Sequence, residues 1–207
     1  VPRVPVAGVV MHDGEPVDGA MVWLNDVNNR TLEKVDTTGR DGRFTFEVPK
    51  TLLSSDWRSR PAVVAWKEGI VPAMAKLSHV TDFESLVLTS GDPVTVSGTV
   101  RDAEGNPVGG ADVDVYCISN AEAALEMSRF IDIVFTGDPF PPFSVKSDES
   151  GSFEIPNVIL GSGGWLRAGK DGYANGFVLQ MQFGSEPVDV TLPGASIITA
   201  RVTDADT

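Results

Sequence analysis

The chain repeats one pattern of motifs, and this internal repeat constrains its fold more than any other feature. "VAGVV" from Val6 matches "VSGTV" from Val96, and "GEPVDGA" matches "GNPVGGA" in the turn that follows. "TTGRDGRFTFEVP" then matches "KSDESGSFEIP", and "VVAWKEGIVPA" matches "LRAGKDGYANG", in the same order. Motifs that recur in a fixed order indicate copies of one structural unit. We therefore expect two tandem domains, residues 1–92 and 93–195.

A third copy of the first motif stands near the end of the chain. "ITARVTDAD" from Ile198 resembles "VSGTVRDAE" from Val96, position for position. We expect residues 196–207 to be the first strand of a truncated third repeat. The alternative is that this last strand pairs with the sheet edge of a neighbouring molecule.

Each copy has the pattern of short strands separated by turns. "GAMVWLN" and "ADVDVYC" alternate with a period near two, and Gly, Pro, Asp and Asn gather between such runs. Gly42 and Gly151 each precede a phenylalanine strand, so we expect them to adopt a positive backbone angle that lets Phe44 and Phe153 enter the core. Short, evenly spaced strands with these turns predict a β-sandwich.

The second copy carries an insertion, residues 119–143, that departs from the strand pattern. Ser119 and Glu122 form a capping box, and Ala124, Met127, Ile131 and Val134 follow at helical spacing. The sequence therefore predicts a helix of two to three turns over the sandwich, followed by a proline-rich loop.

The motifs together resemble the carboxypeptidase regulatory-like domain family. They are the "V.G.V" strand at Val96–Val100, the "G.PV.GA" turn, the "D..G.F" hairpin at Asp148–Phe153 and the "A.K.GY" strand at Ala168–Tyr173. The first copy matches too, with Ile70 in place of the usual aromatic residue. The resemblance implies an all-β chain of two seven-stranded, Greek-key, prealbumin-like sandwiches. It also implies an accessory module without catalytic residues.

Charge and cysteine content exclude several classes of function. The net charge of −13 argues against nucleic acid as a partner, because such surfaces are built from clustered Lys and Arg. No apolar run is long enough for membrane insertion. Cys117 is the single cysteine, so no internal disulfide can form, and its alternating strand favours a buried thiol.

Catalytic and metal sites find weak support. His12 and His79 are the only histidines and are widely separated, so no triad or zinc site is indicated, and we expect no enzyme. Two acidic turns could offer oxygens to a weak calcium site: Asp102 with Glu104, and Asp148 with Glu149. The alternative is that these carboxylates cap the amides of their own turns. No other cofactor is expected.

Aromatic residues in loops are the candidates for a glycan-binding surface, because sugars stack on exposed rings. Trp57, Phe140 and Phe143 fit that description, and Trp165 after "GSGG" could face either way. The alternative is that these rings close the ends of the sandwich. Trp23 and Trp66 lie inside strands and are expected in the core.

The sequence therefore predicts a non-catalytic structural, adhesive or spacer module of a larger secreted, periplasmic or cell-surface bacterial protein. Its expected partners are other protein domains or repeats of the same chain. The alternative is a carbohydrate-binding accessory region of a secreted enzyme. Pro93 in the short junction between the copies favours a limited range of inter-domain angles.

Overall fold

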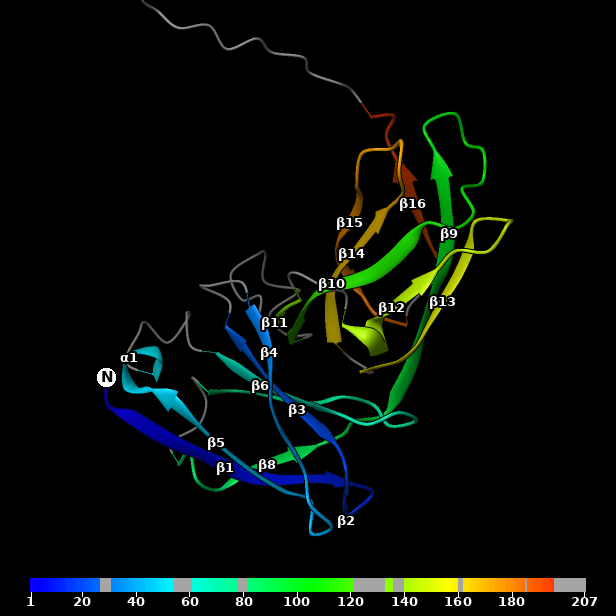
Figure 1. The fold of residues 1–207 in the computed structure, drawn as a ribbon. Coiled ribbons are helices and arrows are strands. Elements are labelled where there is room, and N and C mark those ends of the chain that lie inside the picture. The colour runs from blue at the N-terminus through cyan, green and yellow to red at the C-terminus, as the bar shows by residue number, and fades with distance from the viewer. Residues whose placement is uncertain are drawn as a thin grey trace, which may run out of the picture.

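Nearly all regular structure in the chain is β-strand, as the sequence predicts (Figure 1). The computed structural model describes residues 1–26, 31–53, 61–77, 82–120, 133–135, 140–159, 162–184 and 186–195. Within them, the helical segments include α1 (Lys50–Leu53) and the 3-10 turn η3 (Pro141–Phe143). Neither is long enough to cross a membrane.

The first half of the chain, residues 1–92, forms two sheets that face each other. β5 runs antiparallel to β1, β8 runs parallel to β1 on its other side, and β2 extends β1 in a tight hairpin. The second sheet has the order β4-β3-β6-β7. The strands are β1 (Arg3–His12), β2 (Glu15–Pro16), β3 (Met21–Asp26), β4 (Thr31–Thr37), β5 (Arg43–Pro49), β6 (Ala62–Trp66), β7 (Ala73–Lys76) and β8 (Leu86–Thr89).

The second half, residues 93–195, shows the same strand pairings. β9 pairs with β13 antiparallel and with β16 parallel, as β1 pairs with β5 and β8. The other sheet has the order β11-β10-β14-β15, with β12 also on β10. The strands are β9 (Pro93–Asp102), β10 (Asp112–Asn120), β11 (Ile133–Val134), β12 (Ser144–Lys146), β13 (Ser152–Ile159), β14 (Ser162–Gly169), β15 (Gly176–Gln182) and β16 (Val188–Leu192).

The hairpin glycines behave as the sequence predicts. Gly42 has a φ of 71° and Gly151 a φ of 78°, the left-handed region that glycine enters without a steric penalty. The strands that follow alternate buried and exposed residues, and Phe44 and Phe153 are each only 3% exposed. Each aromatic ring therefore fills the core of its own half.

The insertion in the second half differs from the prediction where the structure describes it. Ser119 does not cap a helix, because β10 continues through Asn120 and pairs Ser119 with Gly163. Val134 does not end a helix either; it lies in β11, opposite Cys117. These segments gain ladder hydrogen bonds from β10 and β14, which override the local helical spacing. Residues 121–132, which carry most of the predicted helix, lie outside the described residues, as does the expected third repeat at 196–207.

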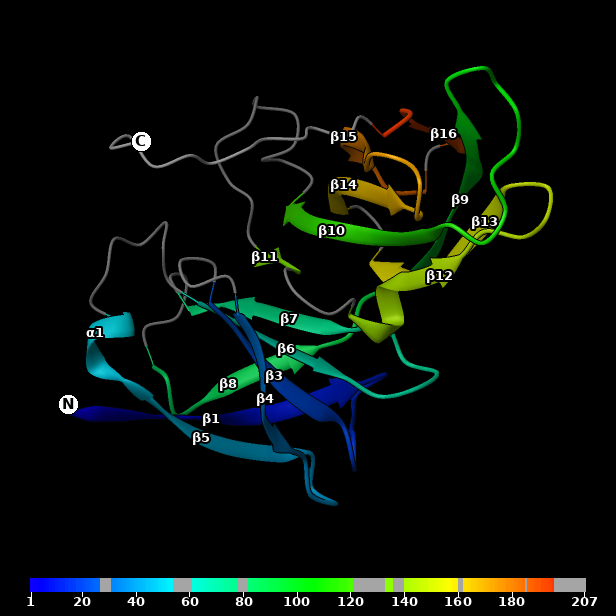
Figure 2. The ribbon, with the colours of Figure 1, turned by 45° about the horizontal axis from the view of Figure 1, so that its top comes forward.

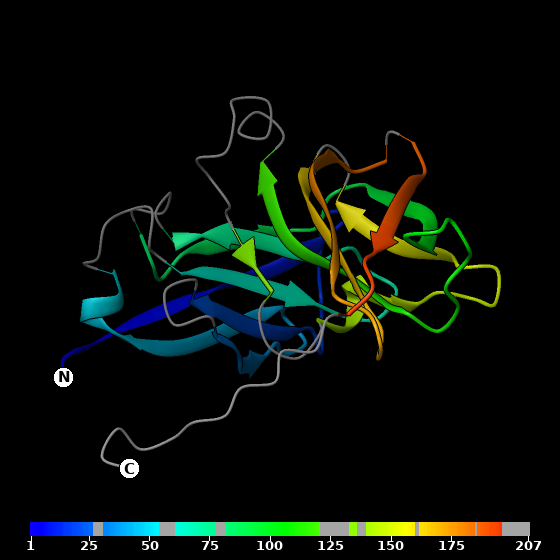
Figure 3. The same cartoon turned by 90° about the horizontal axis from the view of Figure 1, so that it is seen from above.

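The two halves share a hydrophobic contact across one sheet face. Ala62 and Val64 of β6 belong to the same buried cluster as the core of the second half. Trp23 and Trp66, expected inside the first core, are instead partly buried on the outer face of that sheet and pack against this cluster. In Figure 2, the β4-β3-β6-β7 sheet lies between the second half and the sheet that contains β1, β5 and β8. In Figure 3, β14–β16 run across the direction of β1 and β3.

Candidate functional site

The acidic turn at Asp102 uses its carboxylate to hold its own backbone. Asp102 Oδ1 accepts hydrogen bonds from the amides of Glu104 (3.0 Å) and Asn106 (2.8 Å), and Asn106 Nδ2 donates to Oδ2 at 3.0 Å. The pKa of Asp102 is lowered, chiefly by the Asn106 side chain. The geometry is that of an Asx turn that stabilises the ionised carboxylate without a cation.

The second acidic turn, at Asp148 and Glu149, is built in the same way. Asp148 Oδ1 accepts from the Ser150 amide (2.9 Å), the Ser150 hydroxyl (2.7 Å) and the Ser152 amide (2.9 Å). Glu149 is exposed at the tip of the turn. Within the described part of the chain, no three His, Cys, Asp or Glu side chains gather as a metal site. These carboxylates therefore act on their own turns.

Ser147, next to Asp148, has a structural role that was not predicted from the sequence. Its buried hydroxyl donates to Val108 O (2.8 Å) and accepts from the Ala111 amide (3.0 Å), so it ties the hairpin to the "G.PV.GA" turn. In the first half the buried hydroxyl of Thr38 makes the same pair of bonds, to Val17 O at 2.6 Å and from the Ala20 amide at 2.8 Å. The signal was present, because both aligned positions carry a hydroxyl.

Two of the four aromatic glycan candidates are buried. Phe140 is 1% and Phe143 0% exposed, so neither presents a ring to solvent. Phe140 stacks instead on Phe135, with ring centroids 5.0 Å apart, and Phe143 meets Phe135 edge-on at 5.4 Å. The reason is that the proline-rich loop turns inward through η3 and seals the contact with the first half. Trp57 lies outside the described residues.

Trp165 is the remaining candidate, and it lies on the outer face of β14. Its ring stacks on Tyr116 of β10, with centroids 6.2 Å apart and planes 11° from parallel. Phe177 of β15, 47% exposed, meets Tyr116 edge-on at 5.9 Å. The structure thus brings three rings from three neighbouring strands onto one sheet face, and only Trp165 among them is a candidate from the sequence.

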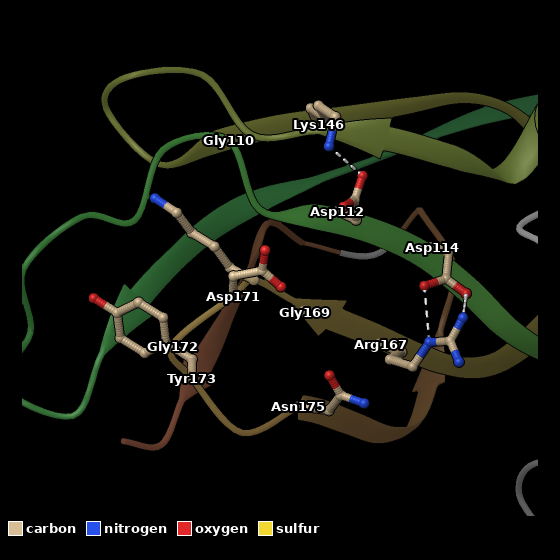
Figure 4. Close-up of a pocket in the computed structure, with 11 residues that line it drawn as sticks. Gly110, Asp112, Asp114, Lys146, Arg167, Gly169, Asp171, Gly172, Tyr173 and Asn175 are labelled. Carbon is tan, nitrogen blue, oxygen red and sulfur yellow. Dashed lines mark hydrogen bonds and ion pairs between the residues drawn. The ribbon is translucent and has the colours of Figure 1, made fainter. Parts of the chain in front are cut away.

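A polar hollow of about 660 Å³ adjoins these rings (Figure 4). Two ion pairs cross its floor: Lys146 Nζ lies 2.6 Å from Asp112 Oδ1, and Arg167 holds Asp114 through two hydrogen bonds of 3.0 and 2.9 Å. The guanidinium of Arg167 also lies 5.4 Å from the centre of the Tyr116 ring, so it joins the hollow to the aromatic group. The lining residues are Gly110, Asp112, Asp114, Lys146, Arg167, Gly169, Lys170, Asp171, Gly172, Tyr173 and Asn175.

Burial and pairing act in opposite directions on Asp114. Its side chain is only 7% exposed, and this burial raises the pKa of its carboxyl group, while the hydrogen bonds and charge of Arg167 lower it. Arg167 is itself one-quarter exposed. The bidentate contact keeps both planar groups in one orientation at the floor of the hollow.

The hollow exists because the second half has different residues at positions that are apolar in the first. Met21 faces Trp66 across β3 and β6, whereas Asp112 faces Gly169 across the equivalent strands. The aligned sequences likewise replace Trp23 with Asp114, Val64 with Arg167 and Met74 with Phe177. A comparison of aligned positions in the two copies could therefore have revealed this site from the sequence.

The remaining reactive side chains have structural surroundings. His12 Nδ1 lies 2.6 Å from the Ser90 hydroxyl, at the connection between the halves, and His79 lies outside the described residues. Cys117 is 1% exposed, as the sequence predicts, and burial raises the pKa of its thiol to about 12. Neither group is part of the hollow.

No protein-family model matches the chain. No curated protein matches it either. Solved structures with a similar arrangement include the shaft pilin SpaA of Lactobacillus rhamnosus GG, at 13% identity over 96% of this chain and 100% of that one, with a TM-score of 0.32.

A minor pilin of Streptococcus agalactiae has 14% identity over 96% of this chain and 99% of that one, with a TM-score of 0.33. Hydroxyquinol 1,2-dioxygenase from Pseudomonas putida DLL-E4 has 14% identity over 51% of this chain and 57% of that one, with a TM-score of 0.32. With TM-scores this far below 0.5, these likenesses carry no argument about family or activity, and the resemblance to carboxypeptidase regulatory-like domains stays a prediction.

Proposed function

We propose that the chain is a stiff, non-catalytic structural module of a larger secreted or cell-surface bacterial protein. In this proposal it consists of two tandem seven-stranded, Greek-key, prealbumin-like sandwiches of the carboxypeptidase regulatory-like type. Its role is to hold neighbouring protein domains or repeats at a defined distance and angle.

The observation that carries the proposal is the aromatic contact between the halves. Phe140 of the second half lies edge-on to Trp23, with centroids 5.2 Å apart, and 6.3 Å from Trp66. On its other side Phe140 stacks on Phe135 with the ring planes 6° apart. Burial of several aromatic rings between two sandwiches opposes hinge motion, because opening the contact would expose all of them to water.

The connection between the halves supports the same conclusion. Only residues 90–92 separate the end of β8 from the start of β9. The connection is also held to the end of β1, because the Ser90 amide donates to Met11 O at 3.1 Å and the Ser90 hydroxyl contacts His12. A short, anchored linker followed by Pro93 leaves few alternative inter-domain angles.

Small-angle X-ray scattering tests this proposal. The whole chain is expected to scatter as one particle of defined shape, and Phe140→Ala, which removes the ring between Trp23 and the second half, is expected to broaden the distribution of sizes. Phe177→Ala is the matched control, because that ring lies on the open face of the second half. A broad distribution for the unmodified chain, or an unchanged profile for Phe140→Ala, would contradict a rigid spacer.

A further inference from the structure

We propose that the open face of β10, β14 and β15 binds a neutral saccharide chain. The binding surface consists of the rings of Tyr116, Trp165 and Phe177 together with the polar hollow beside them, and we refer to it as the outer-face site. Figure 4 shows the polar hollow. This function is independent of the stiffness proposed above, because that stiffness depends on a different group of aromatic rings, the one around Phe140.

The aromatic part of the outer-face site offers flat apolar surface that remains accessible. Phe177 is 47% exposed, and Tyr116 and Trp165 are partly exposed, although each carries a large apolar ring. The near-parallel stack of Tyr116 on Trp165 keeps these two rings in fixed orientations. Exposed apolar surface next to fixed polar groups is typical of ligand sites, and the C–H face of a pyranose ring is a suitable partner for it.

The polar part is held in place before any ligand arrives. Arg167 is fixed by two hydrogen bonds to Asp114 and by its contact with Tyr116. Lys146 lies beside Asp112 in a solvent-exposed ion pair, which holds it less firmly. Arginine has five N–H donors and a carboxylate has several lone pairs, so both retain unused hydrogen-bonding capacity. A sugar hydroxyl can donate a hydrogen bond to a carboxylate and accept one from arginine at the same time. Pre-organisation of this kind lowers the entropic cost of binding.

The charges of the hollow favour a neutral ligand. Three carboxylates line it, from Asp112, Asp114 and Asp171, and three cations, from Lys146, Arg167 and Lys170. Two of the cations are paired with carboxylates in the structure, and Lys170 Nζ donates to Gly109 O at 2.6 Å. A phosphate or sulfate would need uncompensated cations, and the chain has a net charge of −13.

Some contacts near the outer-face site occur in both halves, and others occur in the second half alone. Lys67 of the first half donates to Asp18 O at 2.8 Å, as Lys170 does to Gly109 O, so this contact serves the shared fold. Asp114, Arg167 and Gly169 have no such counterparts: their aligned positions carry Trp23, Val64 and Trp66, which face the second half. The polar and open character of this face therefore belongs to the second half alone.

The first experiment screens the whole chain against an array of neutral and sulfated oligosaccharides, followed by NMR titration with the neutral oligosaccharide that binds best. The indole N–H signal of Trp165, identified with Trp165→Phe, is expected to shift and saturate. The indole signal of Trp66, which packs against Phe140, is expected to stay in place. Absence of binding to any neutral oligosaccharide, or preference for the sulfated ones, would overturn the proposal.

Two single variants then locate the site. Phe177→Ala and Asn175→Ala are each expected to raise the Kd about tenfold, the loss of about one stacking or hydrogen-bonding contact. Val87→Ala is the control, because Val87 is 62% exposed on β8 of the first half, and it is expected to leave the Kd unchanged. Binding that survives both variants overturns the assignment. Self-association that Phe177→Ala abolishes, in a chain that binds no sugar, would instead identify a protein contact and overturn it as well.

Discussion

At the scale of single residues, glycines at equivalent positions in the two halves allow close packing in each core. A Cβ atom on Gly98 would lie 2.8 Å from Cζ of Phe153 and would overlap the carbonyl oxygen of Val188. A Cβ atom on Gly8 would meet Phe44 and Leu86 in the same way. Both glycines allow a phenylalanine ring to lie directly on the neighbouring strand, which explains why "V.G.V" occurs in each copy.

Cys117 is expected to be unreactive in the folded chain. Burial raises the pKa of its thiol to about 12, so at pH 8 almost none of it is thiolate, the reactive form. Treatment with a thiol-specific disulfide reagent at pH 8 should label no cysteine in the native chain and one after denaturation. Rapid labelling of the native chain would contradict the placement of Cys117 between β11 and β14.

Asp148 is expected to titrate below its ordinary pKa of 3.8, because the Ser150 hydroxyl and the Ser152 amide bond to the ionised form. A lowered pKa in the folded state means that these bonds stabilise the fold above pH 3.8 and that this contribution is lost as the pH falls through the folded-state pKa. Carboxyl-carbon NMR titration measures it, and Ser150→Ala should move the pKa of Asp148 up toward 3.8.

The same residue also tests the calcium hypothesis. Since the oxygens of Asp148 and Asp102 already accept hydrogen bonds from their own turns, we expect added calcium or a chelator to leave the melting temperature unchanged. A melting temperature that rises with calcium, and no longer does so in Asp148→Asn, would show that these carboxylates are ligands.

At the scale of elements, the turn before β10 and the hairpin before β13 depend on one hydroxyl. Ser147→Ala would leave the buried Ala111 amide without its acceptor, and the free energy of unfolding is expected to fall by about 1–3 kcal/mol. Glu149→Ala, in the same hairpin but exposed, is the control and should change it by about 0.5 kcal/mol or less. Chemical denaturation measures both, and equal effects would contradict the bracing role of Ser147.

The two equivalent sheets carry different side chains on their outer faces, depending on what covers each face. β3 and β6 carry Trp23, Val64 and Trp66 on the outer face of their sheet, where the second half covers them. β10 and β14 carry Asp114, Arg167 and Gly169 at the aligned positions, on the open face. The same backbone pairing therefore supports an interface in one half and a polar hollow in the other.

At the scale of the whole molecule, the shared aromatic cluster couples the unfolding of the halves. The unmodified chain is expected to unfold in one calorimetric transition. Phe140→Ala removes a buried ring, which costs about 3–5 kcal/mol, and is expected to separate two transitions. Phe177→Ala should keep the single transition. Two transitions in the unmodified chain would show that the halves fold independently of their contact.

The all-β class, the hairpin glycines, the buried phenylalanines and the buried thiol could be predicted because each follows from local pattern. Alternation of side chains along a strand and the backbone freedom of glycine depend only on neighbouring residues. Helical spacing is also a local pattern, and it predicts a helix that includes Ser119 and Val134. This prediction is wrong at both residues, because Ser119 pairs with β14 and Val134 pairs with β10.

The sequence by itself determined that the chain is built from strands and that one pattern of motifs is used twice, since these properties depend on residues close together along the chain. Only the tertiary structure decided which strand faces become interface and which remain open. Phe140 is buried because Trp23 and Trp66 lie opposite it, and Tyr116, Trp165 and Phe177 form one surface because β10, β14 and β15 are neighbours. Contacts between residues far apart in sequence depend on how the sheets are placed, and no local pattern records that placement.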